Sequence, residues 1–198
     1  MTRSTPPAWA EWLLYLLLSP RDRETVSGDM LELYRDAALQ ARGPRPADLW
    51  YVREVLRLAW LQNRGWITLL SLSMFGRTTL DWLVPTSDFG PRALWSTTFG
   101  AGIFLLAGFV AAWRSSSVVS GAFASLTTAL AAGLVHSVGA VTLLAASYSP
   151  ETLAAVRQSG GLSEAITLPI LLCIPAVALG ATAAIVARLL STVTSCRS

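Results

Sequence analysis

The chain has 198 residues, of which 53% are hydrophobic and only 14% are charged, and its mean hydropathy is +0.52. These values exceed those of an ordinary soluble domain, so the composition predicts a membrane protein and excludes a soluble one. All 15 basic residues are arginines, and 12 acidic residues reduce the net charge to +3, which argues against a nucleic-acid-binding surface.

The charged residues divide the chain into two parts. Residues 1–65 hold nine arginines and eight acidic residues, whereas residues 66–198 hold six arginines and four acidic residues. We therefore predict a polar N-terminal module over residues 1–65 and a membrane region over residues 66–198.

Residues 1–65 are predicted to form three helices. The first runs from Trp9 to Leu18 and lacks the cleavage site of a signal peptide, so we expect it to stay on the protein. Ser19 then has the features of an N-cap for the second helix, because a proline follows it and Asp22 comes three residues later, as in a capping box.

The second helix is expected to end near Arg42, since a glycine and a proline follow directly. Pro46 then starts a third helix that reaches Arg64 and Gly65. The sequence thus predicts a small three-helix module before the membrane region.

Several short motifs of this module occur together, in the same order, in one known family. They are Pro20-Arg21-Asp22-Arg23-Glu24, Gly28-Asp29, Leu33-Tyr34-Arg35, Leu49-Trp50-Tyr51 and Val55-Leu56-Arg57. In these motifs the first third of the chain resembles the permease prefix domain, which precedes some bacterial ABC-type permeases of the macrolide-exporter class. The resemblance implies a cytoplasmic module attached to helices in the bacterial inner membrane.

The chain also departs from those permeases. It has no polar stretch long enough to form their large extracytoplasmic domain. It also lacks the G-x-x-x-x-G-K-[ST] loop that holds the phosphates of ATP, so no ATPase is expected.

Three segments are long and apolar enough to cross a membrane, where about 20 residues are needed: Leu94–Trp113, Val118–Ser147 and Ile166–Leu190. Only four residues separate the first two segments, so these must form an antiparallel hairpin. The third contains Pro169 and Pro175, which membrane helices tolerate better than soluble ones.

A fourth segment, Trp66–Val84, is apolar but contains Arg77 and Asp81. These two residues are one helical turn apart and can neutralise each other, so the segment either crosses the membrane or lies flat at its surface. With four spans and a cytoplasmic N-terminus, Arg114 and the arginines of the C-terminal tail are cytoplasmic, as the positive-inside rule favours. We therefore expect four spans over three, with both termini cytoplasmic.

Two features point to metal chemistry, and both have a simpler interpretation. Asp29, Glu32 and Asp36 share one helix face, but no histidine accompanies them, so a solvated face is favoured over a metal or acid–base site. Cys173 and Cys196 lack metal-ligand spacing and are interpreted as free thiols. We expect neither a metal nor a cofactor.

Three arginines share a face just before the membrane region. They are Arg53, Arg57 and Arg64, and we refer to them as the arginine stripe. Basic side chains at this position attract anionic lipid headgroups by about 1 kcal/mol each. The stripe therefore predicts a lipid contact, and it is equally compatible with a simple orientation signal.

His136 is the only histidine and lies within Val118–Ser147. Either it makes a hydrogen bond between helices, which we favour, or it takes up a proton or ligand during transport. Small residues at intervals of four predict close packing of helices, within one chain or between copies. These are Ala129, Gly133, Ser137, Ala176, Gly180 and Ala184.

Together these features predict an all-α, polytopic membrane helical bundle with three or four spans. The favoured function is non-enzymatic: an accessory or interaction protein whose partners are the lipid bilayer and an ABC-type permease or a second copy of the chain. The alternative is a small homo-oligomeric transporter or channel with His136, Arg77 and Asp81 lining the path. A membrane enzyme ranks below both, because no nucleophile has a partnered base.

Overall fold

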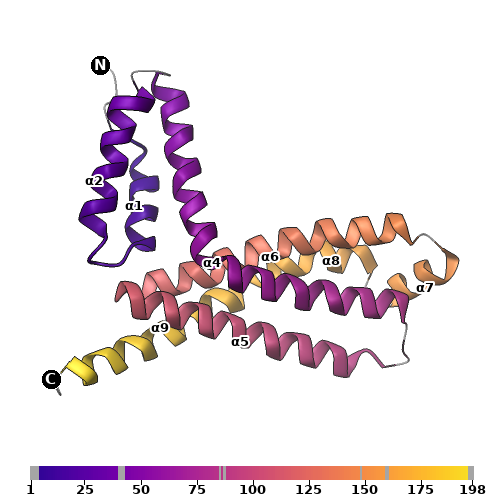
Figure 1. The fold of residues 1–198 in the computed structure, drawn as a ribbon. Coiled ribbons are helices and arrows are strands. Elements are labelled where there is room, and N and C mark those ends of the chain that lie inside the picture. The colour runs from indigo at the N-terminus through magenta and orange to yellow at the C-terminus, as the bar shows by residue number, and fades with distance from the viewer. Residues whose placement is uncertain are drawn as a thin grey trace.

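The protein is described by a computed structural model that covers residues 5–39, 43–84, 86, 88–147, 149–158 and 161–195. Every regular element within these ranges is a helix. Figure 1 shows a short helical module at the N-terminal end and a longer bundle that runs across it. The predicted all-α architecture is therefore confirmed.

The N-terminal module consists of α1 (Ala8–Leu17), α2 (Arg23–Leu33), the π-helical turn η1 (Tyr34–Leu39) and the first half of α4 (Pro44–Leu83). Its core is one cluster of buried side chains from these elements: Ala10, Leu14, Leu18, Met30, Tyr34, Ala47, Tyr51 and Val55. The rings of the two tyrosines meet edge to face with their centroids 5.8 Å apart.

The first helix lies within one residue of its predicted bounds, whereas the second begins later than predicted. Ser19 does not cap a helix that starts at the next residue; its hydroxyl donates to the carboxylate of Asp22 at 2.7 Å, and α2 begins at Arg23. Because Ser19 and Asp22 bond to each other, the intervening residues form a turn. The predicted end near Arg42 lies outside the described residues.

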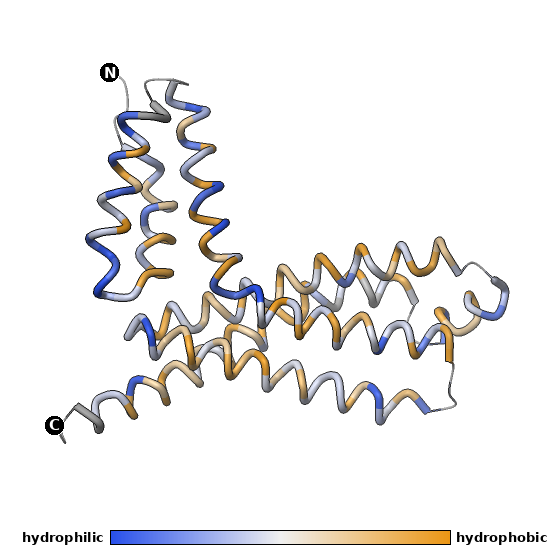
Figure 2. Tube along the Cα trace, viewed as in Figure 1, coloured by the Kyte–Doolittle hydropathy of each residue, from blue (hydrophilic) through white to orange (hydrophobic). Residues whose placement is uncertain are grey.

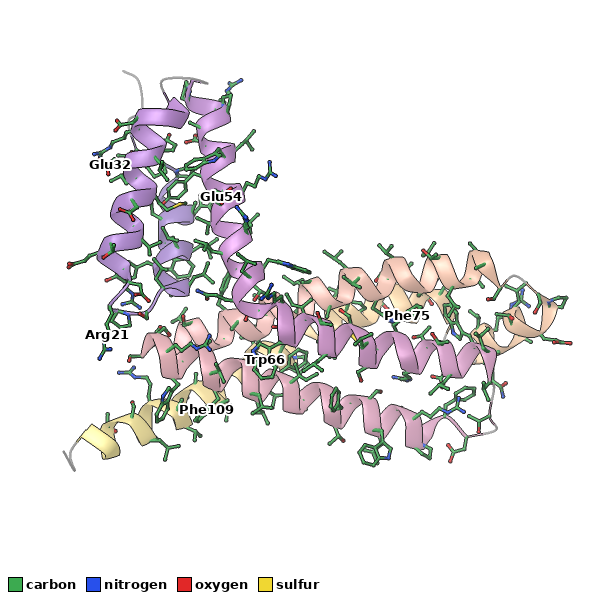
Figure 3. The ribbon with its side chains drawn as sticks, in the orientation of Figure 1. Arg21, Glu32, Glu54, Trp66, Phe75 and Phe109 are labelled. Atoms are coloured by element: carbon green, nitrogen blue, oxygen red, sulfur yellow. The ribbon has the colours of Figure 1, made fainter. Side chains whose placement is uncertain are left out.

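The largest departure from the expected elements is α4, a single helix of 40 residues. The third predicted helix was expected to end at Gly65. A helix can pass through a glycine, however, when no residue in the left-handed conformation and no proline follows. Figure 1 shows that α4 turns sharply midway, and Figure 3 places Trp66 at this corner. In Figure 2 the corner is hydrophilic, and Asn63 there donates to the Ala59 carbonyl at 3.0 Å.

The second half of α4 packs in a bundle with α5 (Gly90–Ser115), α6 (Val118–Ala146), α8 (Gly161–Leu171) and α9 (Cys173–Ser195). The helices α5 and α6 form the predicted antiparallel hairpin. Ser116, in the left-handed conformation at φ 55°, ends α5, and the Ser117 hydroxyl accepts from the Ser120 amide to start α6.

Three helices in the described part of the chain are long and apolar enough to cross a membrane: Gly90–Ser115, Val118–Ala146 and Pro169–Thr192. They match the three predicted spans. The third is interrupted at Leu172, between α8 and α9. Pro175 has no amide hydrogen to donate to the carbonyl of Leu171, so the helical hydrogen bonding fails at this point.

The module is fixed to one end of the bundle. Arg23 donates to the Ser115 carbonyl at 3.4 Å, and the Ser120 hydroxyl donates to the Leu16 carbonyl. Figure 1 shows the module, the α5–α6 connection and the end of α9 at this end, whereas α7 (Pro150–Gln158) lies at the opposite end. We refer to these as the module end and the far end.

Candidate functional site

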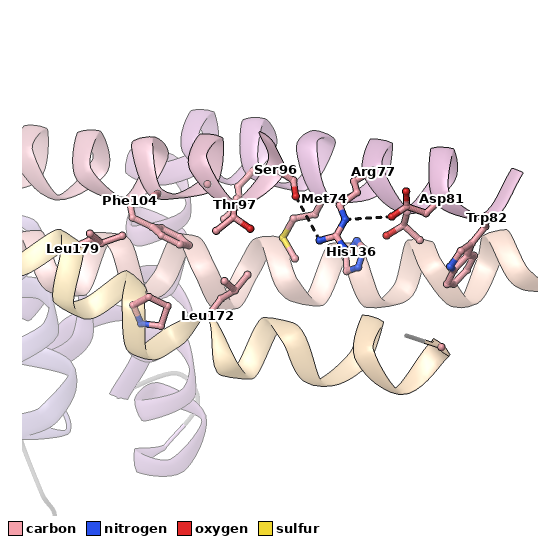
Figure 4. Close-up of a pocket in the computed structure, with 16 residues that line it drawn as sticks. Met74, Arg77, Asp81, Trp82, Ser96, Thr97, Phe104, His136, Leu172 and Leu179 are labelled. Atoms are coloured by element: carbon pink, nitrogen blue, oxygen red, sulfur yellow. Dashed lines mark hydrogen bonds and ion pairs between the residues drawn. The ribbon is translucent and has the colours of Figure 1, made fainter. Parts of the chain in front are cut away.

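A cavity of about 200 Å³ lies inside the bundle, toward the far end. It forms because α5 packs along α9, whereas α8 packs on α6 and leaves space beside α5. Figure 4 shows side chains from α4, α5, α6 and α9 that point into this space. Its apolar walls come from Leu70, Met74, Gly100, Ala101, Phe104, Leu172, Pro175 and Leu179.

One end of the cavity carries a network of charged side chains around Asp81. Asp81 is only 3% exposed, and its carboxylate accepts from Arg77 at 3.3 Å and from Arg92 at 3.3 Å. Arg77 also reaches the Ser96 hydroxyl at 3.5 Å.

The sequence predicted the Arg77–Asp81 pair from its spacing, but it did not predict Arg92. Arg92 also donates to the carbonyls of Leu80 and Val84, at 3.0 and 2.9 Å. It thus supplies hydrogen bonds to carbonyl groups at the end of α4. A residue on another helix gives no periodic signal, so only the fold brings it to this pair.

His136 lies beside Arg77 in Figure 4 and forms part of the cavity wall. The residue is 2% exposed, and its Nδ1 atom is buried with no hydrogen-bond partner among the described residues. The favoured sequence interpretation, a hydrogen bond between helices, is therefore not made through Nδ1. His136, Arg77 and Asp81, which lie on two different helices, do converge on one cavity.

The arginine stripe is exposed on the outer face of the first half of α4. Arg57 forms an exposed ion pair with Glu54 at 3.5 Å. Apolar side chains that the sequence analysis did not single out alternate with the stripe on the same face. They are Leu49, Leu56 and Trp60, which are 71%, 56% and 48% exposed.

The described acidic and cysteine candidates for metal chemistry do not line the cavity. Asp29, Glu32 and Asp36 are exposed to solvent. Among the described residues, no group of three or more histidine, cysteine or acidic side chains could hold a metal ion. The thiol of Cys173 lies 3.4 Å from the Pro169 carbonyl, and Cys196 lies outside the described residues.

The small residues lie mainly at contacts within one chain. Ala129, Gly133, Ala176, Gly180 and Ala184 are all buried in the bundle, whereas Ser137 is half-buried. A Cβ atom on Gly180 would collide with Ser125, and one on Gly133 would collide with Pro169. These positions let the helices approach closely.

We compared the chain with protein-family models, with curated proteins and with solved structures, and it matches none of them. The resemblance of residues 1–65 to the permease prefix domain therefore stays a prediction.

Proposed function

We propose that the chain is a non-enzymatic, multi-pass protein of the bacterial inner membrane that presents its N-terminal module to a membrane partner, an ABC-type permease. The observation that carries this proposal is the continuity of α4, which joins the module and the bundle in one helix. Two hydrogen bonds also hold the module at the bundle end. A module held in this way has a fixed height and orientation relative to the bilayer.

Four antiparallel spans are the topology that this proposal requires. The 18 residues of 66–83 extend about 27 Å as a helix, close to the hydrocarbon thickness of about 30 Å. The charges of Arg77 and Asp81 are paired near the far end, which lowers the cost of burying them. Arg114 and Arg188 then lie at the module end, and the positive-inside rule makes that end cytoplasmic.

With this topology, the outer face of the first half of α4 meets the membrane surface. In Figure 1, α1 and α2 lie on the side of α4 away from the far end of the bundle, so this face is turned toward the lipid beside the bundle. The alternation of leucine, tryptophan and arginine on the face is typical of interfacial helices. Lipid thus occupies one side of the module and leaves α1 for a partner.

The partner is proposed to bind the exposed aromatic face of α1. Trp9, Trp12 and Tyr15 are 54%, 56% and 54% exposed and lie on the side of α1 opposite the module core. Arg23 stacks over the Tyr15 ring at 4.2 Å. Aromatic and arginine side chains are enriched at protein–protein interfaces, where they supply most of the binding energy.

Copurification tests this proposal. The full chain, tagged at the C-terminus, is isolated in mild detergent, and we expect an ABC-type permease to accompany it. Replacement of Trp9 and Trp12 by serine should remove the permease, whereas Trp95→Ser, at a residue that is 77% exposed on α5, should not. Equal permease recovery from both variants, or none from the wild-type chain, would contradict the proposal.

The topology is tested separately by labelling single cysteines in whole cells. We expect positions in α2 and beyond α9 to react only after the inner membrane is opened. A position in the α4–α5 connection should react without opening it. A C-terminal position that reacts from the periplasm would replace four spans by three.

A small homo-oligomeric transporter or channel is the second candidate, because the cavity unites His136, Arg77 and Asp81. In this case His136→Gln should abolish proton-coupled flux into liposomes while expression and detergent stability stay normal, since glutamine does not titrate near neutral pH. Unchanged flux would exclude a titrating role for His136.

A further inference from the structure

We propose that a crevice between the module and the bundle binds one zwitterionic phospholipid whose head carries a primary amine, as that of phosphatidylethanolamine does. The phosphate of this lipid lies at Arg114, its ammonium group lies at Asp22 and Asn63, and its acyl chains run along α5 and α6. The inference rests on the membrane location in the proposed function, because α5 and α6 must be spans, but it involves no permease.

The crevice has a volume of about 310 Å³ and lies where the module meets the bundle. Its walls come from the end of α1 and the turn that follows, from α4 around the corner, from the last turns of α5 and from the start of α6. Leu16 and Ser120, which bond to each other across the junction, both line it. A ligand in the crevice therefore contacts the module and the bundle at once.

The polarity of the crevice changes with depth in the way that a phospholipid requires. The helix α5 ends at the module end, and the residues with which it lines the crevice change from Arg114 near this end to Val110 and Ala107 deeper in the bundle. This stretch of helix extends about 10 Å. The helix α6 starts at the module end and adds Phe123 to the apolar wall. A head at the surface thus continues into acyl chains that point toward the midplane.

Two tryptophans mark the headgroup level at the height of the crevice. Trp66 is half-buried and lines the crevice, and Trp113, next to Arg114, is 47% exposed. Trp113 stacks on Phe109 with the ring centroids 5.7 Å apart. Tryptophan is enriched at membrane–water interfaces. The polar end of the crevice therefore lies among lipid headgroups.

Hydrogen-bond acceptors with spare capacity favour an ammonium group. Asn63 is only 5% exposed and lines the crevice. Its amide nitrogen donates to the Ala59 carbonyl, whereas its carbonyl oxygen accepts no hydrogen bond from a described residue. Buried polar groups are normally paired, so this oxygen points to a donor in the crevice.

A carboxylate lines the same crevice. Among the described residues, Asp22 accepts a hydrogen bond from the Ser19 hydroxyl alone and forms no ion pair. A primary ammonium group supplies a positive charge for the carboxylate and three N–H donors, so it can also serve an amide oxygen. A quaternary ammonium group supplies the charge without the donors.

The cation at the rim of the crevice favours a phosphate. Arg114 is exposed, lines the crevice and forms no ion pair within the described part of the chain. Arg23 does not line it, because its guanidinium group stacks on Tyr15 and donates to the Ser115 carbonyl. A guanidinium group matches the geometry of phosphate. Since Arg114 and Asp22 do not pair with each other, a head that carries both charges complements this rim.

The test uses the full chain in a non-ionic detergent and native mass spectrometry, with three phospholipids that have identical acyl chains. They are phosphatidylethanolamine, phosphatidylcholine, whose methylated amine has no N–H donor, and phosphatidylglycerol, which has no amine. We expect one phosphatidylethanolamine per chain, bound about tenfold more tightly than either of the others. Equal affinity for phosphatidylethanolamine and phosphatidylcholine, or tighter binding of phosphatidylglycerol, would overturn the proposal.

Substitutions separate the two ends of the head. Arg114→Gln should weaken the binding of all three lipids by about tenfold, whereas Asp22→Asn should weaken only that of phosphatidylethanolamine. Arg157→Gln, at an exposed arginine of α7 outside the crevice, is the matched control and should change each affinity by less than about twofold. Equal effects of the two arginine substitutions, or full lipid preference in Asp22→Asn, would overturn the proposal. The comparison of lipids on the wild-type chain keeps it testable if a variant does not fold.

The soluble head, O-phosphoethanolamine, distinguishes a lipid from a free small molecule. It should bind at least about a hundredfold more weakly than the lipid, because it cannot use the apolar wall. Equal binding of the two would overturn the proposal in favour of a soluble ligand. None of these measurements involves the permease, so failed copurification and failed lipid binding are separate results.

Discussion

Substitution of one glycine at the centre of the bundle gives a sharp test of the helix packing. Gly108 of α5 lies against the backbone of α9, where a Cβ atom built on it would come within 2.6 Å of both the Cα atom and the carbonyl oxygen of Gly180. Both contacts are with backbone, which cannot rotate away as the end of a side chain can. Gly108→Ala must therefore move α5 away from α9.

The size of this effect follows from the distance. Ordinary contacts of a Cβ atom begin near 3.4 Å, so the two helices must separate by most of 1 Å. Overpacking of this kind costs about 1–3 kcal/mol. Alanine gains about 1 kcal/mol over glycine as a helix former, so we expect a net loss of up to about 2 kcal/mol.

Gly102→Ala is the matched control, because it makes the same change in the same helix where a Cβ atom would meet nothing within 4 Å. It should leave stability unchanged or raise it by up to about 1 kcal/mol. The assay is unfolding by sodium dodecyl sulfate in mixed micelles, followed by circular dichroism. Equal midpoints for the two variants would refute the close approach of α5 and α9.

Three further outcomes follow from the structure. Burial, and then the charge of Glu11, raises the pKa of Tyr51 from 10.0 to about 12. The free energy of unfolding of the module should therefore be constant just below pH 10 and fall by up to about 3 kcal/mol as the pH rises to 12. Tyr51→Phe should remove this loss, which alkaline unfolding measures. Asp81→Asn should destabilise the bundle by about 3 kcal/mol in detergent, because it leaves two arginines without their shared carboxylate, and a change below about 1 kcal/mol would contradict the network. A spin label at Leu56 in liposomes should lie deeper as the fraction of anionic lipid rises, and replacement of the arginine stripe by glutamine should abolish this dependence.

The sequence was sufficient for the parts of the fold that depend on local pattern. The three apolar spans, the tight turn between Trp113 and Val118, and the first helix follow from hydrophobic length and spacing, and the structure has them within a few residues. Local rules failed at Gly65, because a glycine ends a helix only when the following residues leave the helical conformation. The resulting 40-residue helix joins two parts that the sequence had separated.

The candidate site was only half predictable, for a related reason. Arg77 and Asp81 are neighbours on one helix, so their spacing was enough to pair them. Arg92 comes from α5 and His136 from α6, and only the packing of these helices brings Arg92 to Asp81 and His136 to the cavity. The same applies to Gly180, whose small size was recognised although its contacts with Gly108 and Ser125 were not.

The cavity itself arises from the prolines of the last span. Pro175 breaks the helical hydrogen bonding beside Leu172, so α8 and α9 need not follow one straight axis. The helix α9 can then lie in close contact with α5, through the glycines of both helices, while α8 stays on α6. Arg77 and His136 line the space left beside α5. The break between α8 and α9 therefore leaves room next to these two polar side chains. A straight final helix would pack along α5 over its full length and fill this space.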